Sequence, residues 1–211
     1  MSDGMPTHEL DLVVGSMITV RPEEDQAMYN EEKAWLEDVQ DLLREEGIQV
    51  DLVSRPGTEV WEGGIESFND LYTLRRLAAH AERGNDLSGV AAEPGDEDEV
   101  DPLLADIWEG AEQTKFLHLI NHQGEGGYYL PVDFAEPIWL SYGEDEEEED
   151  EEWNDEVVSF GSSVALLREL TDLESLLGGA GSAVDHALAT LRTLREAAQK
   201  SIEHELPVIL W

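Results

Sequence analysis

Two histidines and two carboxylates near the middle of the chain could together hold a metal ion. His118, His122, Glu125 and Asp133 fall within sixteen residues. A metal site needs imidazole nitrogens and carboxylate oxygens that converge on one point. If residues 118–122 form a strand, the two histidines share one of its faces. One hypothesis is therefore a metal-assisted enzyme centred on His118, His122 and Asp133, although the HExxH pattern of zinc proteases is absent.

The same histidines also have a structural explanation, which we favour. A histidine in a core or at a strand end commonly pairs with a backbone carbonyl, and the spacing of His118 and His122 is not specific for metal binding. The sequence therefore leaves the protein's status as an enzyme open and leans against it. We predict no catalytic residue and no cofactor.

Three further patterns fall short of a catalytic or ligand-binding motif. Ser162 and Ser163 stand in FGSSV, which has only the first glycine of a G-x-S-x-G nucleophile elbow, so helix capping explains them better. The glycines of residues 124–127 precede no lysine and no clear helix, which indicates a hairpin turn. The acids of residues 96–101 lack the glycine and the final glutamate of an EF-hand loop.

A small group of basic side chains raises a separate possibility. Arg75 and Arg76 are adjacent, and His80 follows at helical spacing. In so acidic a chain they could hold an anionic ligand. The interpretation we favour is that they pair with nearby carboxylates on the solvent face of a helix.

The strongest chemical signal in the sequence is electrostatic. Residues 144–156 read EDEEEEDEEWNDE, and eleven of these thirteen residues are carboxylates. Unpaired charges are too costly to bury, so the segment must be solvated, screened by cations or held against a basic partner. We predict a partner-binding segment made of Glu144, Asp145, Glu146, Glu147, Glu148, Glu149, Asp150, Glu151, Glu152 and Trp153.

The acidity extends over the whole chain. The formal net charge is −38 over 211 residues, with 12 Lys and Arg against 50 Asp and Glu. Binding to phosphates depends on Lys and Arg, and anionic membranes repel an acidic surface. The composition therefore argues against direct binding to nucleic acid or to a membrane. It is compatible with a basic protein as partner.

Two explanations of this charge stay open. In the first, the protein is a binding module that captures a basic partner, as an immunity protein or a nucleic-acid mimic does. An extended chain advances roughly 3.3 Å per residue, close to the ~3.4 Å phosphate spacing of one DNA strand. In the second, the charge is a solubility adaptation to a salt-rich cytoplasm and says nothing about partners.

The remaining composition indicates a folded cytoplasmic protein. Apolar residues make up 41% of the chain, which is too many for a wholly disordered acidic protein. There is no cysteine, so disulfides and thiol chemistry are excluded. No apolar run approaches the roughly 18 residues of a membrane span, and the acidic N-terminus is not typical of a signal peptide.

Hydrophobic periodicity predicts the elements that position these groups. Helices are expected over residues 22–47, 66–83, 101–110, 162–177 and 182–206. Strands are expected over residues 10–20, 48–53, 115–120, 128–132, 137–142, 157–160 and 208–211. Residues 56–64 are expected to be a loop, and residues 85–100 a polar connection.

The order of these elements predicts the fold class. Strands cluster in the middle of the chain and do not alternate regularly with helices, which favours α+β over a doubly wound parallel fold. We predict a single domain over residues 1–211, with a mixed or mostly antiparallel sheet packed against several helices. If the segments on either side of residues 144–156 pair, that run is an acidic loop protruding from the sheet.

Three segments resemble a widespread but uncharacterised family of bacterial proteins. They are HLINHQGEGGYYLPVDF at 118–134, FGSSVALLREL at 160–170 and AAQKSIEH at 197–204. The resemblance covers the C-terminal half of the chain. It implies one intact domain, and it transfers no functional residue because the family has no established activity. The acidic residues 144–156 depart from the family pattern.

Overall fold

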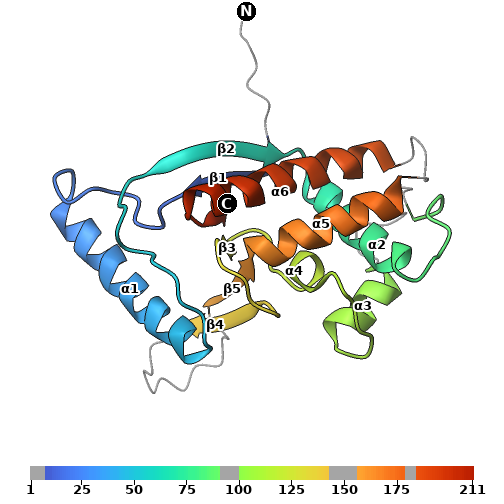
Figure 1. Cartoon of the computed structure of the whole chain (residues 1–211), viewed down its shortest axis with the longest axis horizontal. Coiled ribbons are helices and arrows are strands. Elements are labelled where there is room, and N and C mark those ends of the chain that lie inside the picture. Colours follow the sequence, from blue (N-terminus) through green and yellow to red (C-terminus); the bar gives the residue numbers. More distant parts are fainter. Residues whose placement is uncertain (1–7, 91–99, 143–155, 179–183) are drawn as a thin grey trace, which may run out of the picture.

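The protein is represented by a computed structural model that describes residues 8–90, 100–142, 156–178 and 184–211. Figure 1 shows its helices and strands in chain order. The elements are β1 Leu10–Gly15, α1 Gln26–Glu45, β2 Glu59–Ile65, α2 Phe68–Ala81, α3 Pro102–Trp108, α4 Leu117–Ile120, β3 Tyr128–Leu130, β4 Ile138–Tyr142, β5 Glu156–Ser162, α5 Ser163–Leu177, α6 Asp185–His204 and β6 Val208–Leu210. None of these helices is long and apolar enough to cross a membrane.

One mixed sheet organises the domain. Its six strands lie in the order β2-β1-β6-β3-β5-β4. β3 and β5 are parallel, whereas the other described strand pairs are antiparallel. The predicted single α+β domain with a mixed sheet is therefore confirmed.

The two faces of the sheet carry two hydrophobic cores. Side chains alternate along each strand, so Val208 and Leu210 enter the larger core with α2, α5 and α6. Ile209, between them, enters the smaller core with Leu36 and Leu43 of α1. Figure 1 shows α1 standing apart from the α2, α3, α5 and α6 group, at the end of the molecule near β4.

Local capping explains where several helices start. Asp25 accepts hydrogen bonds from two N–H groups of the first turn of α1, and Gly47 follows that helix with a positive φ of 81°. Asp101 caps α3, with Pro102 at its first position. The Oγ of Ser162 accepts from the N–H of Ala165, which confirms the predicted cap of α5.

Two predictions about the N-terminal half are wrong. Residues 56–64, expected as a loop, contain most of the edge strand β2, where Gly63 leaves room for the ring of Trp61. Residues 48–53, expected as a strand, form no strand. There the Asp51 carboxylate accepts from the N–H groups of Val53 and Ser54, which turns the chain.

A third prediction is wrong in the segment that carries the histidines. Residues 115–120 form no strand, and Leu117–Ile120 is the short helix α4. The carboxylate of Glu169, on α5, accepts hydrogen bonds from the N–H groups of His118 and Leu119. The carboxylate that accepts from the first N–H groups of this helix lies about 50 residues away in the sequence. No local sequence pattern therefore predicts the helix.

The strands on either side of the acidic run are partners. β4 and β5 pair antiparallel, with Tyr142 opposite Glu156. Glu156 therefore belongs to a strand, whereas residues 144–155 lie outside the described residues, as do residues 91–99 of the polar connection. The prediction of an inserted acidic loop was conditional on pairing of the two flanking segments, and β4 and β5 do pair.

Candidate functional site

His118 is a buried structural group in this fold. Its Nδ1 accepts a hydrogen bond from the N–H of Ser162 at 2.9 Å. Its Nε2 lies 3.1 Å and 3.2 Å from the carbonyl oxygens of Phe134 and Ala135, and donates to them. Burial lowers the pKa of His118, although the bonds to these two carbonyls raise it in part. Both ring nitrogens are thus committed to the backbone.

His122 is held in the same way. Its Nδ1 accepts from the N–H of Gly124 at 3.1 Å, and its Nε2 donates to the carbonyl of Tyr128 at 3.0 Å. The ring stacks on Tyr129 with a centroid distance of 3.9 Å. Burial lowers the pKa of His122 to about 3, so the ring is neutral near pH 7.

The third member of the predicted metal set lies apart from these contacts. The carboxylate of Asp133 forms an exposed ion pair with Arg168, at 2.6 Å. In the part of the chain that the structure describes, no three His, Asp or Glu side chains are arranged to hold a metal ion. The metal-assisted hypothesis for His118, His122 and Asp133 therefore finds no ligand set there.

Side chains from β3 and α2 donate hydrogen bonds that satisfy the backbone around α4. The hydroxyl of Tyr129 donates to the carbonyl of His118 at 2.9 Å. Arg75 donates to the carbonyls of Leu119 and His122, at 2.9 Å and 2.6 Å. Because a four-residue helix satisfies few of its own polar groups, these contacts hold it in place.

Glu169 completes this polar group from the N-terminal side of α4. Its side chain is 9% exposed. Burial raises the pKa of Glu169 to about 7, against the lowering effect of the N–H groups of His118 and Leu119. Sequence reasoning missed this role, because an acid on a leucine-rich helix gives no sign of a partner about 50 residues away.

The predicted pairing with a carboxylate is correct for Arg76 and His80, whereas the predicted position of these side chains on the solvent face of the helix is wrong. Arg76 and His80 contact the carboxylate of Asp101, at 3.3 Å and 3.1 Å, and these side chains are largely buried. Burial alone would raise the pKa of Asp101, but bonds from His80, the backbone of Leu104 and Arg76 lower it. Arg75, in contrast, pairs with no carboxylate among the described residues.

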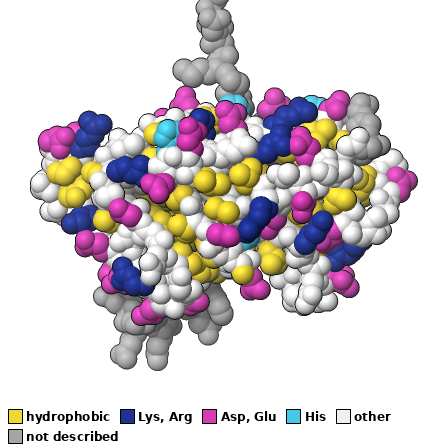
Figure 2. Space-filling view, viewed as in Figure 1, with side chains coloured by type: hydrophobic (Ala, Val, Ile, Leu, Met, Phe, Trp, Pro, Cys, Tyr) yellow, Lys and Arg dark blue, Asp and Glu magenta, His cyan; other side chains and the backbone are white. Residues whose placement is uncertain are grey.

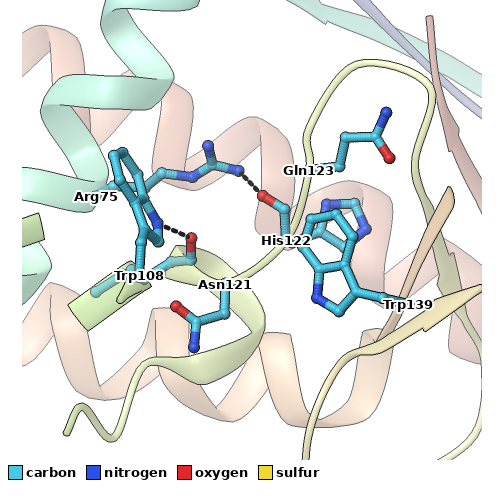
Figure 3. A pocket seen from close by; sticks show the side chains of 7 residues that line it. Arg75, Trp108, Asn121, His122, Gln123 and Trp139 are labelled. Atoms are coloured by element: carbon cyan, nitrogen blue, oxygen red, sulfur yellow. Dashed lines mark hydrogen bonds between the residues drawn. The ribbon is translucent and has the colours of Figure 1, made fainter. Parts of the chain in front are cut away.

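A pocket opens beside this polar group, between α2, α3, α4 and β4. Its volume is about 580 Å³. Figure 3 shows Trp108 and Trp139 on opposite sides of it, with the Arg75 guanidinium and the Asn121 amide between them. The lining residues are Arg75, Trp108, Ile120, Asn121, His122, Gln123 and Trp139. The sequence did not predict this pocket.

The segment around α1 is strongly acidic and accounts for 8 of the 22 net negative charges of the described residues. Residues 23–46, around α1, hold ten acids and two bases. On α1, Glu31, Asp38 and Glu45 are exposed at seven-residue intervals, turned away from the buried Leu36. We call these three residues the α1 acidic line. Within the residues that the structure covers, none of the three forms an ion pair.

The helices α5 and α6 are closer to neutral. α5 and α6 together hold six acids and four bases. Figure 2 shows basic and acidic side chains next to one another across the face that carries these helices. Ion pairs such as Arg195 with Glu174, and Lys200 with Glu203, account for this pattern. The charge is therefore distributed unevenly over the domain.

A second pocket adjoins the acidic segment around α1. It has a volume of about 460 Å³ and lies between the C-terminal end of α1 and the chain entering β4. Two exposed carboxylates, Glu46 and Glu136, and the indole of Trp139 are part of its wall. In this pocket a cationic group could interact with two carboxylates, an aromatic ring and the negative end of the α1 helix dipole.

The predicted partner-binding residues follow β4 in the sequence. Glu144, Asp145, Glu146, Glu147, Glu148, Glu149, Asp150, Glu151, Glu152 and Trp153 are outside the described residues. They join the body through β4 and β5, whose side chains Ile138, Leu140 and Val158 pack against the core that α1 covers.

Comparison with known protein families places this chain. A family model described as "Putative DNA-mimic protein" matches residues 8–210. The match spans nearly the whole chain, so the resemblance to an uncharacterised family is confirmed and extends beyond the C-terminal half. No curated protein and no solved structure matches this chain.

Proposed function

The chain belongs to the family of putative DNA-mimic proteins, and from that premise we propose that it is a binding module that captures a basic, DNA-binding protein. Membership across residues 8–210 is the observation that carries the proposal. The net charge of −38 supports it, because a mimic must present to its partner the negative charge that DNA would present.

The α1 acidic line supplies one fixed part of that surface. Glu31, Asp38 and Glu45 are two helical turns apart, or roughly 10.5 Å. Because α1 is anchored through Leu36 and Leu43, these carboxylates are held in place before a partner arrives. Preorganised charges steer a basic protein toward the site and lose little entropy on binding.

The acidic run supplies a denser part. We propose that Glu144–Glu152 offers nine successive carboxylates to the partner. An extended backbone spaces residues by roughly 3.3 Å, so the run matches or exceeds the charge density of one DNA strand. Trp153, directly after it, would add an aromatic contact of the kind that concentrates binding energy at interfaces.

The pocket between α1 and β4 offers an anchor for one side chain of the partner. We propose that an arginine or lysine enters it, placing its charge near Glu46 and Glu136 and its flat or aliphatic part on Trp139. Arginine is especially suited, because its guanidinium both pairs with carboxylates and stacks on aromatic rings.

Competition with DNA is the direct test of this function. Basic proteins retained on DNA-cellulose are passed over the immobilised full chain, and the proteins that it captures are then challenged with duplex DNA. We expect DNA to release them, and we expect the soluble chain to inhibit their binding to labelled duplex. Proteins that hold the chain and DNA at the same time would contradict mimicry.

Charge-neutral variants locate the surface. One variant changes every Glu and Asp of residues 144–152 to Gln and Asn, and a second carries Glu31→Gln, Asp38→Asn and Glu45→Gln. A matched control neutralises three exposed acids elsewhere on the protein, through Asp106→Asn on α3, Glu109→Gln at the C-terminal end of α3, and Asp172→Asn on α5. We expect at least a roughly tenfold loss of affinity in the first variant and a smaller loss in the second.

Salt dependence gives the second readout of the same variants. The affinity of the unchanged chain should fall steeply as salt rises, and the first variant should show a shallower slope. If the matched control weakens binding as much as the α1 variant, the proposed surface is wrong, although capture itself stands.

A further inference from the structure

Arg75 carries a positive charge that no acidic side chain of the described structure balances. Its Nε and Nη2 donate to the carbonyls of Leu119 and His122. Among the residues described, none accepts a hydrogen bond from its Nη1, and no carboxylate lies within 4 Å. Burial lowers the pKa of Arg75, which expresses the cost of holding this charge away from water. The described residues include 34 acids for 12 Lys and Arg, so an arginine with no acidic partner among them is unusual and requires an explanation.

Asn121 contributes an unsatisfied polar atom to the same pocket. Its Oδ1 is buried and has no hydrogen-bond partner in the described structure. Such an atom destabilises the folded protein when it stays unpaired. If the Asn121 side chain turns toward the pocket, a ligand donor or a bridging water molecule would satisfy this oxygen.

Two indoles form the flat walls. Trp108 and Trp139 are 44% and 49% exposed, which is high for side chains of this size. The Nε1 of Trp108 donates to the carbonyl of Ile120 at 2.9 Å, so this ring is fixed in orientation. Figure 3 shows the two rings on either side of Asn121, where they can offer their faces to a flat guest.

We propose that this pocket binds a small molecule made of a flat aromatic ring that carries a carboxylate or a phosphate group. The anionic group pairs with Arg75, the ring lies against Trp108 or Trp139, and a donor on the ligand reaches Asn121. The volume of about 580 Å³ is in the usual range of roughly 300–1,000 Å³ for small-molecule sites. The proposal does not depend on capture of a basic protein, although Trp139 also lines the pocket proposed for a basic side chain of that partner.

Salt distinguishes the two binding events. An anion approaching a molecule of charge −38 is repelled at long range, and salt screens that repulsion. Affinity for the aromatic acid should therefore hold or rise as salt is added, whereas affinity for a basic protein should fall. Opposite salt slopes in one preparation would show two binding events with different electrostatics.

The test compares aromatic acids with their neutral analogues. Indole-3-acetate and adenosine 5′-monophosphate represent the carboxylate and phosphate classes, and indole-3-acetamide and adenosine are the uncharged controls. Binding to the full chain is followed by calorimetry and by tryptophan fluorescence. We expect saturable binding of at least one acid, at least about tenfold tighter than its own neutral analogue, and the tighter acid identifies the class of anion.

Two variants test the assignment of the pocket. Asn121→Ala removes an unsatisfied polar atom, so the protein should stay as stable as before while its affinity falls several-fold. Trp139→Ala should weaken binding about tenfold, and Trp211→Ala is the matched control, since Trp211 is also exposed but does not line the pocket. Equal binding of acid and neutral analogue, no saturable binding, or variants that bind like the unchanged chain would each overturn the proposal.

Discussion

At the level of single residues, Glu169 and His122 make opposite contributions to the pH dependence of stability. Burial raises the pKa of Glu169 from its ordinary 4.5 to about 7. Its contribution to stability is therefore full below about pH 4.5 and is lost as the pH rises through 7. The pKa of His122 falls from 6.5 to about 3, so its contribution is full above pH 6.5 and is lost on acidification. The two oppose one another between these limits.

The variant Glu169→Gln tests the contribution of Glu169 to the pH dependence of stability. It removes the proton that the folded state takes up below pH 7, so its unfolding free energy should rise with pH more steeply than that of the unchanged protein. Between pH 4.5 and 7.5 the difference between the two should change by up to about 3 kcal/mol. Urea unfolding at several pH values measures it. With Glu109→Gln, an exposed control, the difference should not vary, and a constant difference for Glu169→Gln would contradict the assigned pKa.

At the level of elements, the sequence predicts the helices and strands that are specified by their own residues. α5 and α6 have apolar residues at helical spacing along their whole length, and most of these positions are buried as the spacing predicts. β4 was recognisable from its apolar residues between Pro137 and the acidic run. Elements that depend on distant groups were not recognisable, since α4 needs Glu169 and Arg75, and β2 needs its pairing with β1.

The candidate sites follow the same division. The charge of the α1 acidic line and of the acidic run could be counted in the sequence. The pocket could not be predicted, because Arg75, Trp108, Asn121 and Trp139 come from separate parts of the chain and meet only after folding. His118 and His122 were recognised as special, and the structure gives both rings backbone partners.

The start of α3 gives a prediction at the scale of one element. Asp101 accepts from the N–H groups of Leu103 and Leu104, and it also contacts Arg76 and His80. Asp101→Ala removes the helix cap and leaves a partly buried arginine without its partner, so we expect a loss of about 3–5 kcal/mol. Urea unfolding measures the loss. Asp106→Ala, on the exposed side of the same helix, should change stability by less than about 0.5 kcal/mol. Similar losses in both variants would refute the role of Asp101.

At the level of the whole molecule, the uneven charge has an energetic cost. Sixteen of the 50 acids lie outside the described residues, which still carry a net charge of −22. On α1, Glu37, Asp41 and Glu45 follow one another at four-residue intervals, and like charges at this spacing cost about 0.2–0.5 kcal/mol per pair. Ion pairs of Glu37 with Lys33 and of Asp41 with Arg44 offset only part of this cost. A function that needs concentrated negative charge would explain why this cost is retained.

The salt dependence of stability distinguishes that explanation from adaptation to a salt-rich cytoplasm. The screening length falls from about 30 Å at 0.01 M to about 10 Å at 0.1 M and 3 Å at 1 M. If repulsion is the only effect of salt, the melting temperature should rise up to a few tenths molar KCl and then level off. In the variant Glu31→Gln, Asp38→Asn, Glu45→Gln, the melting temperature should start higher and rise less. Calorimetry across KCl concentrations gives both curves. A melting temperature that keeps climbing toward molar KCl, equally in both proteins, would favour the halophilic explanation and would remove the charge as evidence for a basic partner.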